Sequence, residues 1–115
     1  MHELSVAKNI IDIVQESLTP SQRPLVKTVR VKIGKLTNIF VDSLLFGFEA
    51  LTKDTDLEGA TLEIEQLPIR VVCSDCGKES ELNDFVFRCP VCQSSNLNII
   101  SGQELFVHEI ELNDE

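Results

Sequence analysis

Val72-Cys73-Ser74-Asp75-Cys76-Gly77 and Arg88-Cys89-Pro90-Val91-Cys92 are the stretches that decide how this chain folds. Each contains a Cys-x-x-Cys pair, and 12 residues separate the two pairs. In a reducing compartment this spacing favours a tetrahedral metal site over disulfides. Four thiolates leave no position open for water or substrate, so the predicted site is structural and its expected ion is Zn²⁺.

Three other interpretations of the cysteines remain open at this point. A single iron held by four thiolates also suits this motif, and purified protein would then be coloured. Four unligated thiols that merely pack are the second alternative, and a redox dithiol is the third, although redox motifs use one Cys-x-x-Cys pair rather than two. With zinc bound, the site carries a net negative charge that the neighbouring Lys78 and Arg88 can help to balance.

Outside the cysteine stretch, hydrophobic spacing predicts two helices and three strands. Apolar residues recur at helical spacing in two segments, and they alternate with polar residues in three others. The expected helices cover 4–18 and 41–51, and the expected strands cover 29–34, 62–67 and 105–112.

The same pattern predicts which side chains in the second helix and the last strand are buried. In the second helix, Phe46 and Phe48 are expected to pack in the core, and Asp42 or Ser43 is the expected start signal. In the last strand, alternation places one set of residues on one face and Glu109 and Glu111 on the other. That first set is Phe106, His108, Ile110 and Leu112. His108 is either a hydrogen-bonded edge histidine or an additional metal ligand.

These elements predict an α+β fold, with two helices packed on a small mixed three-stranded sheet and an inserted zinc-ribbon module. Residues 1–68 and 102–115 form the expected α/β domain, and residues 69–101 form the expected ribbon domain. The ribbon stretch is polar and has few core-forming clusters. Metal binding should therefore supply much of its folding free energy.

Charge and hydropathy limit the classes of partner. The 115 residues carry 19 acidic and 10 basic side chains, for a net charge of −9, which repels nucleic acid and anionic membranes. The sequence has no apolar run near the roughly 20 residues that span a bilayer, and its start does not resemble a secretory signal. We therefore expect a cytoplasmic protein.

Met1-His2-Glu3 is the second candidate metal site. The amine of Met1 and the backbone and ring nitrogens of His2 can close two fused chelate rings around one ion. Nitrogen donors in a square-planar arrangement suit Ni(II) or Cu(II). Glu3 adds a carboxylate within reach of the same ion.

Seven motifs along the chain together resemble the nickel metallochaperones of hydrogenase maturation, the HypA/HybF family. They cover essentially the whole sequence, and an amino-terminal MHE combined with two cysteine pairs is specific. The motifs are MHELS at 1–5, IGKL at 33–36, FGFEAL at 46–51, LEGATLEIE at 57–65, VCSDCG at 72–77, FRCPVCQSSN at 87–96 and IISGQEL at 99–105.

The resemblance implies transient Ni(II) binding at the terminus and a structural Zn²⁺ in the ribbon. Nickel would be held by the Met1 amine, by the backbone and ring nitrogens of His2, and by a backbone or carboxylate donor of Glu3. Zinc would be held by Cys73, Cys76, Cys89 and Cys92.

The resemblance also implies partners. They are a GTP-hydrolysing nickel-insertion partner and the large subunit of nickel-iron hydrogenase, with urease as a further acceptor in some organisms. The chain would act as a monomer or a homodimer.

One position departs from the family pattern. Many members have an aspartate as a further nickel-ligand candidate where this chain has Phe40, and the nearest carboxylate is that of Asp42. The terminus is therefore expected to supply most of the nickel ligands itself.

Three classes of function remain open from the residues alone. They are a nickel carrier, an electron-transfer module with iron, and a zinc-ribbon interaction adaptor without nickel transfer. An enzyme is not expected, because the sequence has no nucleophile motif, no phosphate-binding glycine loop and no second histidine near His2.

Overall fold

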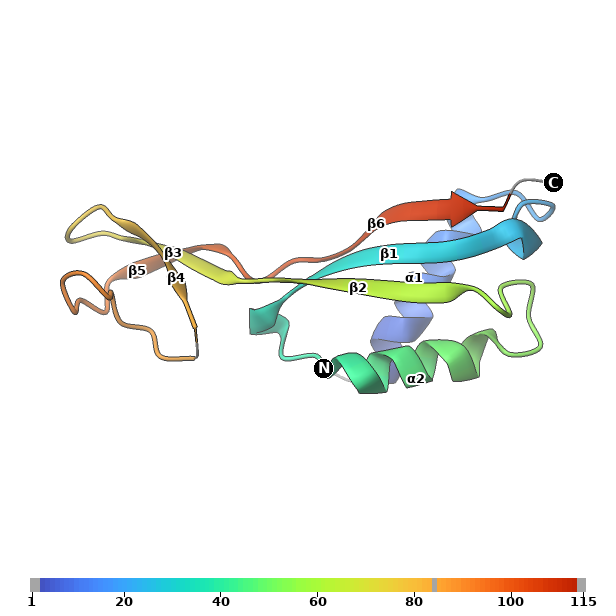
Figure 1. Cartoon of the computed structure of the whole chain (residues 1–115), viewed down its shortest axis with the longest axis horizontal. Helices are drawn as coiled ribbons and strands as arrows, with labels where there is room; N and C mark the ends of the chain where they lie inside the picture. The colour runs from blue at the N-terminus through green and yellow to red at the C-terminus, as the bar shows by residue number, and fades with distance from the viewer. Residues whose placement is uncertain (1–2, 84, 114–115) are drawn as a thin grey trace.

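The computed structural model describes residues 3–83 and 85–113, and it is elongated, with extents of 55 × 24 × 17 Å (Figure 1). The two helices lie at one end and the cysteine stretch at the other. Within the described residues, neither helix has the length and apolar content that a membrane span requires. The elements are α1 (Glu3–Ser17), η1 (Arg23–Leu25), β1 (Val26–Gly34), η2 (Lys35–Thr37), α2 (Val41–Thr52), β2 (Thr61–Leu67), β3 (Ile69–Cys73), β4 (Glu79–Leu82), β5 (Leu97–Ser101) and β6 (Leu105–Leu112).

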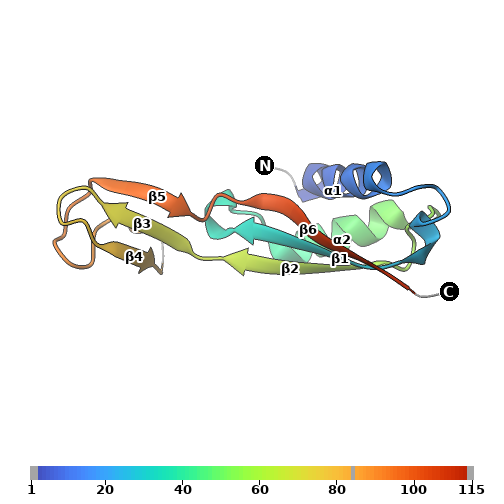
Figure 2. The same cartoon turned by 90° about the horizontal axis from the view of Figure 1, so that it is seen from above.

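The first sheet has the strand order β2-β1-β6. β1 runs parallel to β2 and antiparallel to β6, so the sheet is mixed. A parallel pair needs a crossover connection, and α2 supplies it between β1 and β2. Both helices lie on the same side of this sheet (Figure 2). The predicted α+β fold, with two helices on a mixed three-stranded sheet, is confirmed.

The main core lies between the helices and this sheet. α1 contributes one face, at helical spacing, and β1 contributes the side chains that point toward the helices. The buried members are Val6, Ala7, Ile10, Ile11, Val14, Val26, Val29, Val31, Ile33, Ile39, Leu44, Phe48, Leu57 and Leu62.

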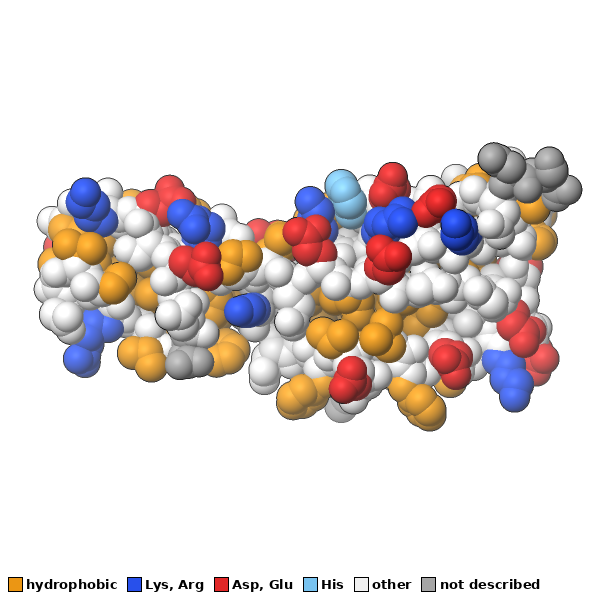
Figure 3. Space-filling model, viewed as in Figure 1, with side chains coloured by type: hydrophobic (Ala, Val, Ile, Leu, Met, Phe, Trp, Pro, Cys, Tyr) orange, Lys and Arg blue, Asp and Glu red, His pale blue; other side chains and the backbone are white. Residues whose placement is uncertain are grey.

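The other face of the sheet carries charges of both signs (Figure 3). Arg30 of β1 donates to Glu63 of β2 at 3.0 Å, to Glu109 of β6 at 3.2 Å and to Glu111 of β6 at 2.9 Å. One guanidinium therefore bridges all three strands. Arg30 and its partners are partly exposed, so each individual pair contributes little to stability.

The α2 helix departs from the sequence prediction at two positions. Phe48 is buried as expected, but the Phe46 side chain is 74% exposed, so the prediction that it packs in the core was wrong. At about 100° per residue, Phe46 lies roughly 200° around the helix from Phe48 and points to solvent. The helix begins after Phe40, with no side-chain cap, and Asp42 lies in its first turn; the predicted start signal was also wrong.

A β-bulge in β6 overturns the predicted alternation of the last strand. The register with β1 shifts between Arg30, which faces Glu109, and Val31, which faces Val107. His108 is the extra residue, so the inward face changes there. Phe106 and His108 are exposed, whereas four residues of β6 pack on the core. Those four are Leu105, Val107, Ile110 and Leu112.

The cysteine stretch forms a second sheet with the strand order β4-β3-β5, in which β3 is antiparallel to both neighbours. Its strands were not predicted. Ile69, Val71 and Leu82 form a small buried cluster there. Leu36 of η2 and Leu97 pack against this cluster, so a side chain from outside the 69–101 stretch completes its core.

The chain passes between the two sheets at a close backbone contact. The Gly34 N–H donates to the carbonyl of Glu104 at 2.8 Å, and the Leu36 N–H donates to the carbonyl of Gly102 at 2.7 Å. A Cβ atom on Gly34 would lie 2.0 Å from the carbonyl carbon of Gly102, which is less than any van der Waals contact. Only glycine fits at position 34.

Gly34→Ala should therefore lower the free energy of unfolding by about 3 kcal/mol or more, since backbone atoms have to move to admit the methyl group. Urea unfolding of the metal-loaded protein measures this. Gly59→Ala is the matched control. Gly59 has a φ of 92° but has no atom within 4 Å of an added Cβ, so only conformational strain of about 1 to 2 kcal/mol is expected. Equal losses in the two variants would contradict the steric account.

Candidate metal centre

The four cysteines converge at the far end of the second sheet, and their Sγ atoms all lie within 4.8 Å of one another. Cys73 and Cys92 are separated by 3.5 Å between sulfurs, and Cys76 and Cys89 by 3.6 Å. Tetrahedral Zn²⁺ with bonds of about 2.3 Å places its sulfurs about 3.8 Å apart. The donor set therefore fits a zinc ion, as expected for a zinc ribbon.

Two turns with the same backbone pattern present the sulfurs. In the first, the Gly77 N–H donates to the Cys73 carbonyl at 2.8 Å, and Gly77 has a φ of 76°. In the second, the Gln93 N–H donates to the Cys89 carbonyl at 2.9 Å, and Gln93 has a φ of 70°. Both turns thus need a left-handed residue directly after the pair. Glycine adopts this conformation without strain at position 77, whereas Gln93 adopts it with a Cβ atom present.

The electrostatics of the cluster favour a bound cation. The N–H groups of Cys92 and Val91 donate to the Cys89 sulfur at 3.5 and 3.4 Å and lower the pKa of Cys89 to about 6. At Cys92 the N–H of Ser94 is the largest single influence and favours the thiolate, but the other three sulfurs and burial together outweigh it and raise the pKa of Cys92 to about 12. Four sulfurs this close cannot all ionise without a compensating positive charge.

A hydrogen-bonded bridge joins the two turns outside the sulfurs. The carboxylate of Asp75 accepts from the Ser94 hydroxyl and from the Asn96 side-chain amide, the latter at 3.1 Å. The Ser74 N–H donates to the Asn96 carbonyl at 2.8 Å. This bridge holds the first pair against the second, and it was not predicted from the sequence. Lys78 and Arg88, which were expected to help balance the charge of the site, are both exposed.

The amino-terminal candidate site is described only from Glu3 onward, since Met1 and His2 lie outside the described residues. Glu3 begins α1, and its Oε2 accepts the backbone N–H of Phe40 at 3.0 Å. This contact places the start of α1 beside the start of α2. Asp42, the nearest carboxylate to Phe40 along the chain, is exposed in the first turn of α2.

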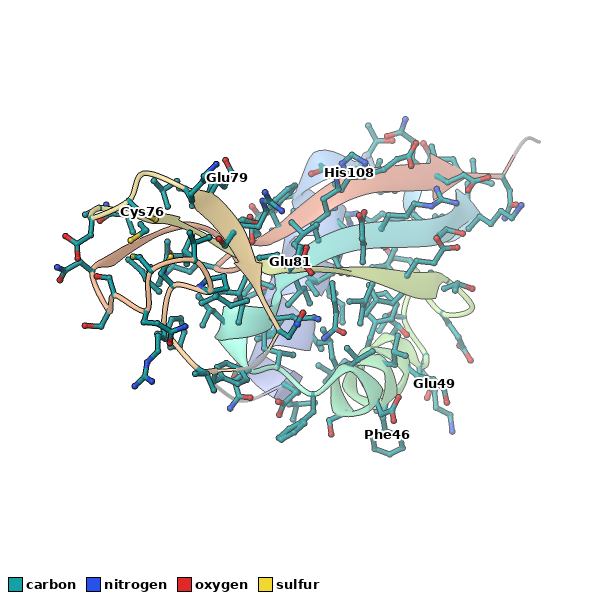
Figure 4. The ribbon with its side chains drawn as sticks, turned by 60° about the vertical axis from the view of Figure 1, so that its left-hand side comes forward. Phe46, Glu49, Cys76, Glu79, Glu81 and His108 are labelled. Carbon is teal, nitrogen blue, oxygen red and sulfur yellow. The ribbon has the colours of Figure 1, made fainter. Side chains whose placement is uncertain are left out.

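His108 does not join the cysteines. It is exposed on β6, away from Cys76 (Figure 4), beside a hollow of about 130 Å³ that Arg30 and Glu63 also line. Over residues 3–83 and 85–113, the side chains gathered closely enough to hold an ion together are the four cysteines.

Comparison with known proteins matches the chain to one family along nearly its whole length. Residues 1–112 match the family model described as hydrogenase/urease nickel incorporation, metallochaperone, HypA. The hydrogenase maturation factor HypA of Desulfatibacillum aliphaticivorans is 44% identical over 115 residues, which cover 99% of this chain and 88% of that protein. The hydrogenase maturation factor HypA of a Roseiflexus species is 38% identical over 116 residues, covering 100% of this chain and 94% of that protein.

Solved structures agree with these sequence matches. The solution structure of the nickel metallochaperone HypA from Helicobacter pylori aligns over 100% of both chains, with a TM-score of 0.67 and 26% identity. A second solution structure of a HypA protein covers 100% of this chain and 98% of its own, with a TM-score of 0.71 and 26% identity.

The backbone of the two cysteine turns predicts opposite effects of adding and removing a Cβ atom. Gln93→Gly should raise the free energy of unfolding by up to about 1 kcal/mol, because glycine adopts a positive φ without strain. Gly77→Ala should lower it by about 1 to 2 kcal/mol. Urea unfolding with zinc present measures both, and Gln93→Ala, which keeps the Cβ, is the control. A gain for Gln93→Ala as large as that for Gln93→Gly would refute this explanation.

Proposed function

Because the chain belongs to the HypA family of nickel-incorporation metallochaperones, we propose that it binds Ni(II) through its amino terminus and delivers the ion for the maturation of nickel-iron hydrogenase. The family acts in hydrogenase maturation and binds nickel and structural zinc. The observation that carries the proposal is the family match over residues 1–112, which spans both Met1-His2-Glu3 and the four-cysteine cluster.

In this proposal, Cys73, Cys76, Cys89 and Cys92 hold a structural Zn²⁺. The ion supplies the two positive charges that allow the four thiols to ionise together. The protein contributes two further kinds of contact. Backbone N–H groups stabilise the Cys89 thiolate, and the Asp75 side chain holds the two turns together. Residues 69–101 then form a ribbon domain that depends on the ion for its folding.

Nickel is the cargo, and the terminus is its carrier site. The donors are the Met1 amine, the backbone and ring nitrogens of His2, and a donor from Glu3 that is either its backbone or its carboxylate. A square-planar set of nitrogens suits Ni(II) and disfavours Zn(II), which prefers a tetrahedron. The thiolate cluster in turn retains zinc. The two sites thus sort the two metals by geometry rather than by affinity.

Release follows from the chemistry of the same donors. The amine and the amide nitrogen must lose their protons to bind nickel, so affinity falls as pH falls. Acidification or contact with a partner can therefore free the ion. Nickel titrations at neutral and mildly acidic pH check this step, and equal affinities at the two pH values would contradict it.

The partners proposed are a GTP-hydrolysing nickel-insertion protein and the hydrogenase large subunit, in the cytoplasm. Urease, which the family description also names, is a second acceptor to assay. The protein carries the ion and does not turn over a substrate, so we propose no enzymatic activity. Neither nucleic acid nor a membrane is a proposed partner, given the net charge of −9.

Replacing a zinc ligand tests the first site. Cys89→Ser should lose the stoichiometric zinc of the wild type and unfold the 69–101 stretch, because a thiolate ligand is removed. Metal analysis and circular dichroism measure this. Ser95→Ala, an exposed change beyond the second pair, should keep both zinc and structure. Full zinc occupancy in Cys89→Ser would contradict the ligand assignment.

Extending the chain tests the second site. One residue added before Met1 should abolish the planar nickel site, since the amine is displaced, and His2→Ala should do the same through loss of the imidazole. Both variants should keep their zinc. Nickel titration with absorption spectra and metal analysis gives the answer. Unchanged nickel stoichiometry and spectrum in the extended variant would show that the terminal amine is not a ligand. Zinc as the only bound metal in both the wild type and His2→Ala would instead favour the zinc-ribbon adaptor.

A further inference from the structure

Glu3 follows the proposed chelate directly and is tied to another part of the chain. Its Oε2 accepts the Phe40 N–H at 3.0 Å, across 37 positions of sequence. Glu3 is half-buried, whereas the Phe40 side chain is 67% exposed. The contact therefore uses the backbone of Phe40 and not its ring.

The donor in this contact is held in place by its neighbours. Ile39 is 6% exposed and belongs to the main core. The Phe40 carbonyl accepts the Leu44 N–H at 3.0 Å in the first turn of α2. Since Phe40 lies between a buried side chain and a helix, its N–H has a fixed position relative to the core.

A second contact holds the same turn of α1. A Cβ atom on Gly47 of α2 would lie 3.4 Å from Cδ1 of Leu4 and 3.6 Å from Cβ of Ala7. The first two turns of α1 therefore pack closely on α2 at a position with no side chain. Together with the Glu3 hydrogen bond, this contact fixes where the chain enters α1.

We propose that the Glu3 side chain positions the nickel site: its carboxylate fastens the start of α1 to the Phe40 N–H and so holds the amino-terminal nitrogen donors. The carboxylate is not itself a nickel donor, which leaves the backbone of Glu3 as the donor from this residue. The inference rests on the proposed function. Ordering a free terminus costs conformational entropy, and a prior anchor reduces what binding has to supply. Moving the carboxylate to a metal would also leave the Phe40 N–H without this acceptor.

A double-mutant cycle tests the anchor with Ni(II) alone as the probe. Glu3→Ala removes the acceptor, and Phe40→Pro removes the donor at a φ of −78°, which proline adopts readily. Each should weaken nickel binding by roughly three- to tenfold, the value of one hydrogen bond, and the double variant should be no weaker than either single one. Phe40→Ala keeps the N–H and should bind like the wild type.

Glu3→Gln separates anchoring from ligation. The amide oxygen still accepts the Phe40 N–H, so nickel stoichiometry and the absorption spectrum of the bound ion should match the wild type, with affinity reduced by at most about threefold. Amide hydrogen exchange without nickel adds an independent readout: exchange at Phe40 should be faster in Glu3→Ala than in the wild type. Zinc content and circular dichroism verify that each variant is folded.

Two results would overturn the inference. One is a changed nickel spectrum in Glu3→Gln, which would make the carboxylate a ligand. The other is additive losses in the double variant, or no loss in a folded Phe40→Pro. Failure of the proposed function looks different, since His2→Ala would then bind nickel as the wild type does, whatever happens at Glu3. Faster Phe40 exchange would still report the anchor in that case.

Discussion

The rest of the structure depends on the backbone contact between Gly34 and Gly102. Three segments meet there: the end of β1, the start of β3 and the turn that leads into β6. An added Cβ on Gly102 would lie 3.2 Å from the Cα of Ile69, so that position is tight as well. Because the backbones are in contact here, Leu36, which follows β1 in η2, reaches the second sheet and completes its core. The distance between the two sheets therefore depends on the absence of a side chain at Gly34 and at Gly102.

The cysteine cluster and the proposed nickel site have opposite requirements, because one has to keep its ion and the other has to release it. The cysteine cluster is closed, with two turns cross-linked by Asp75, which suits an ion that stays. The proposed nickel site has donors that must lose protons to bind the ion, which suits an ion that is released. Retention of zinc would then come from the two convergent backbone turns, and release of nickel from protonation of its donors.

Much of the fold followed from periodicity, and the exceptions have local causes. The spacing in α1 and β1 predicted those elements because a single face of each is buried. Alternation failed in β6, since one bulged residue, His108, reverses the faces and leaves no compositional mark. The strands of the second sheet could not be predicted from periodicity because their core is small. It is completed by Leu36, which lies about 30 residues before the first of these strands in the sequence.

The candidate sites were predictable to different degrees. Cysteine spacing indicated the metal cluster, because two Cys-x-x-Cys pairs at this separation favour a tetrahedral metal site. The Asp75 bridge and the Glu3 contact with Phe40 were not predictable, since each depends on tertiary proximity. Phe46 was misplaced because hydrophobicity alone does not tell the two sides of a short helix apart.

The pairing of β1 with β6 also determines which part of the chain can fold first during translation. Arg30 and its partners on β6 are 79 and 81 positions apart, so the first sheet stays incomplete until synthesis reaches residue 112. Cys73 and Cys92, in the two cysteine turns, are only 19 positions apart, and both turns are synthesised before β6. During translation the metal-binding ribbon can therefore fold before the helices have a finished sheet to cover. Contacts of such high sequence separation also slow folding, which makes the last strand the step that completes the native state.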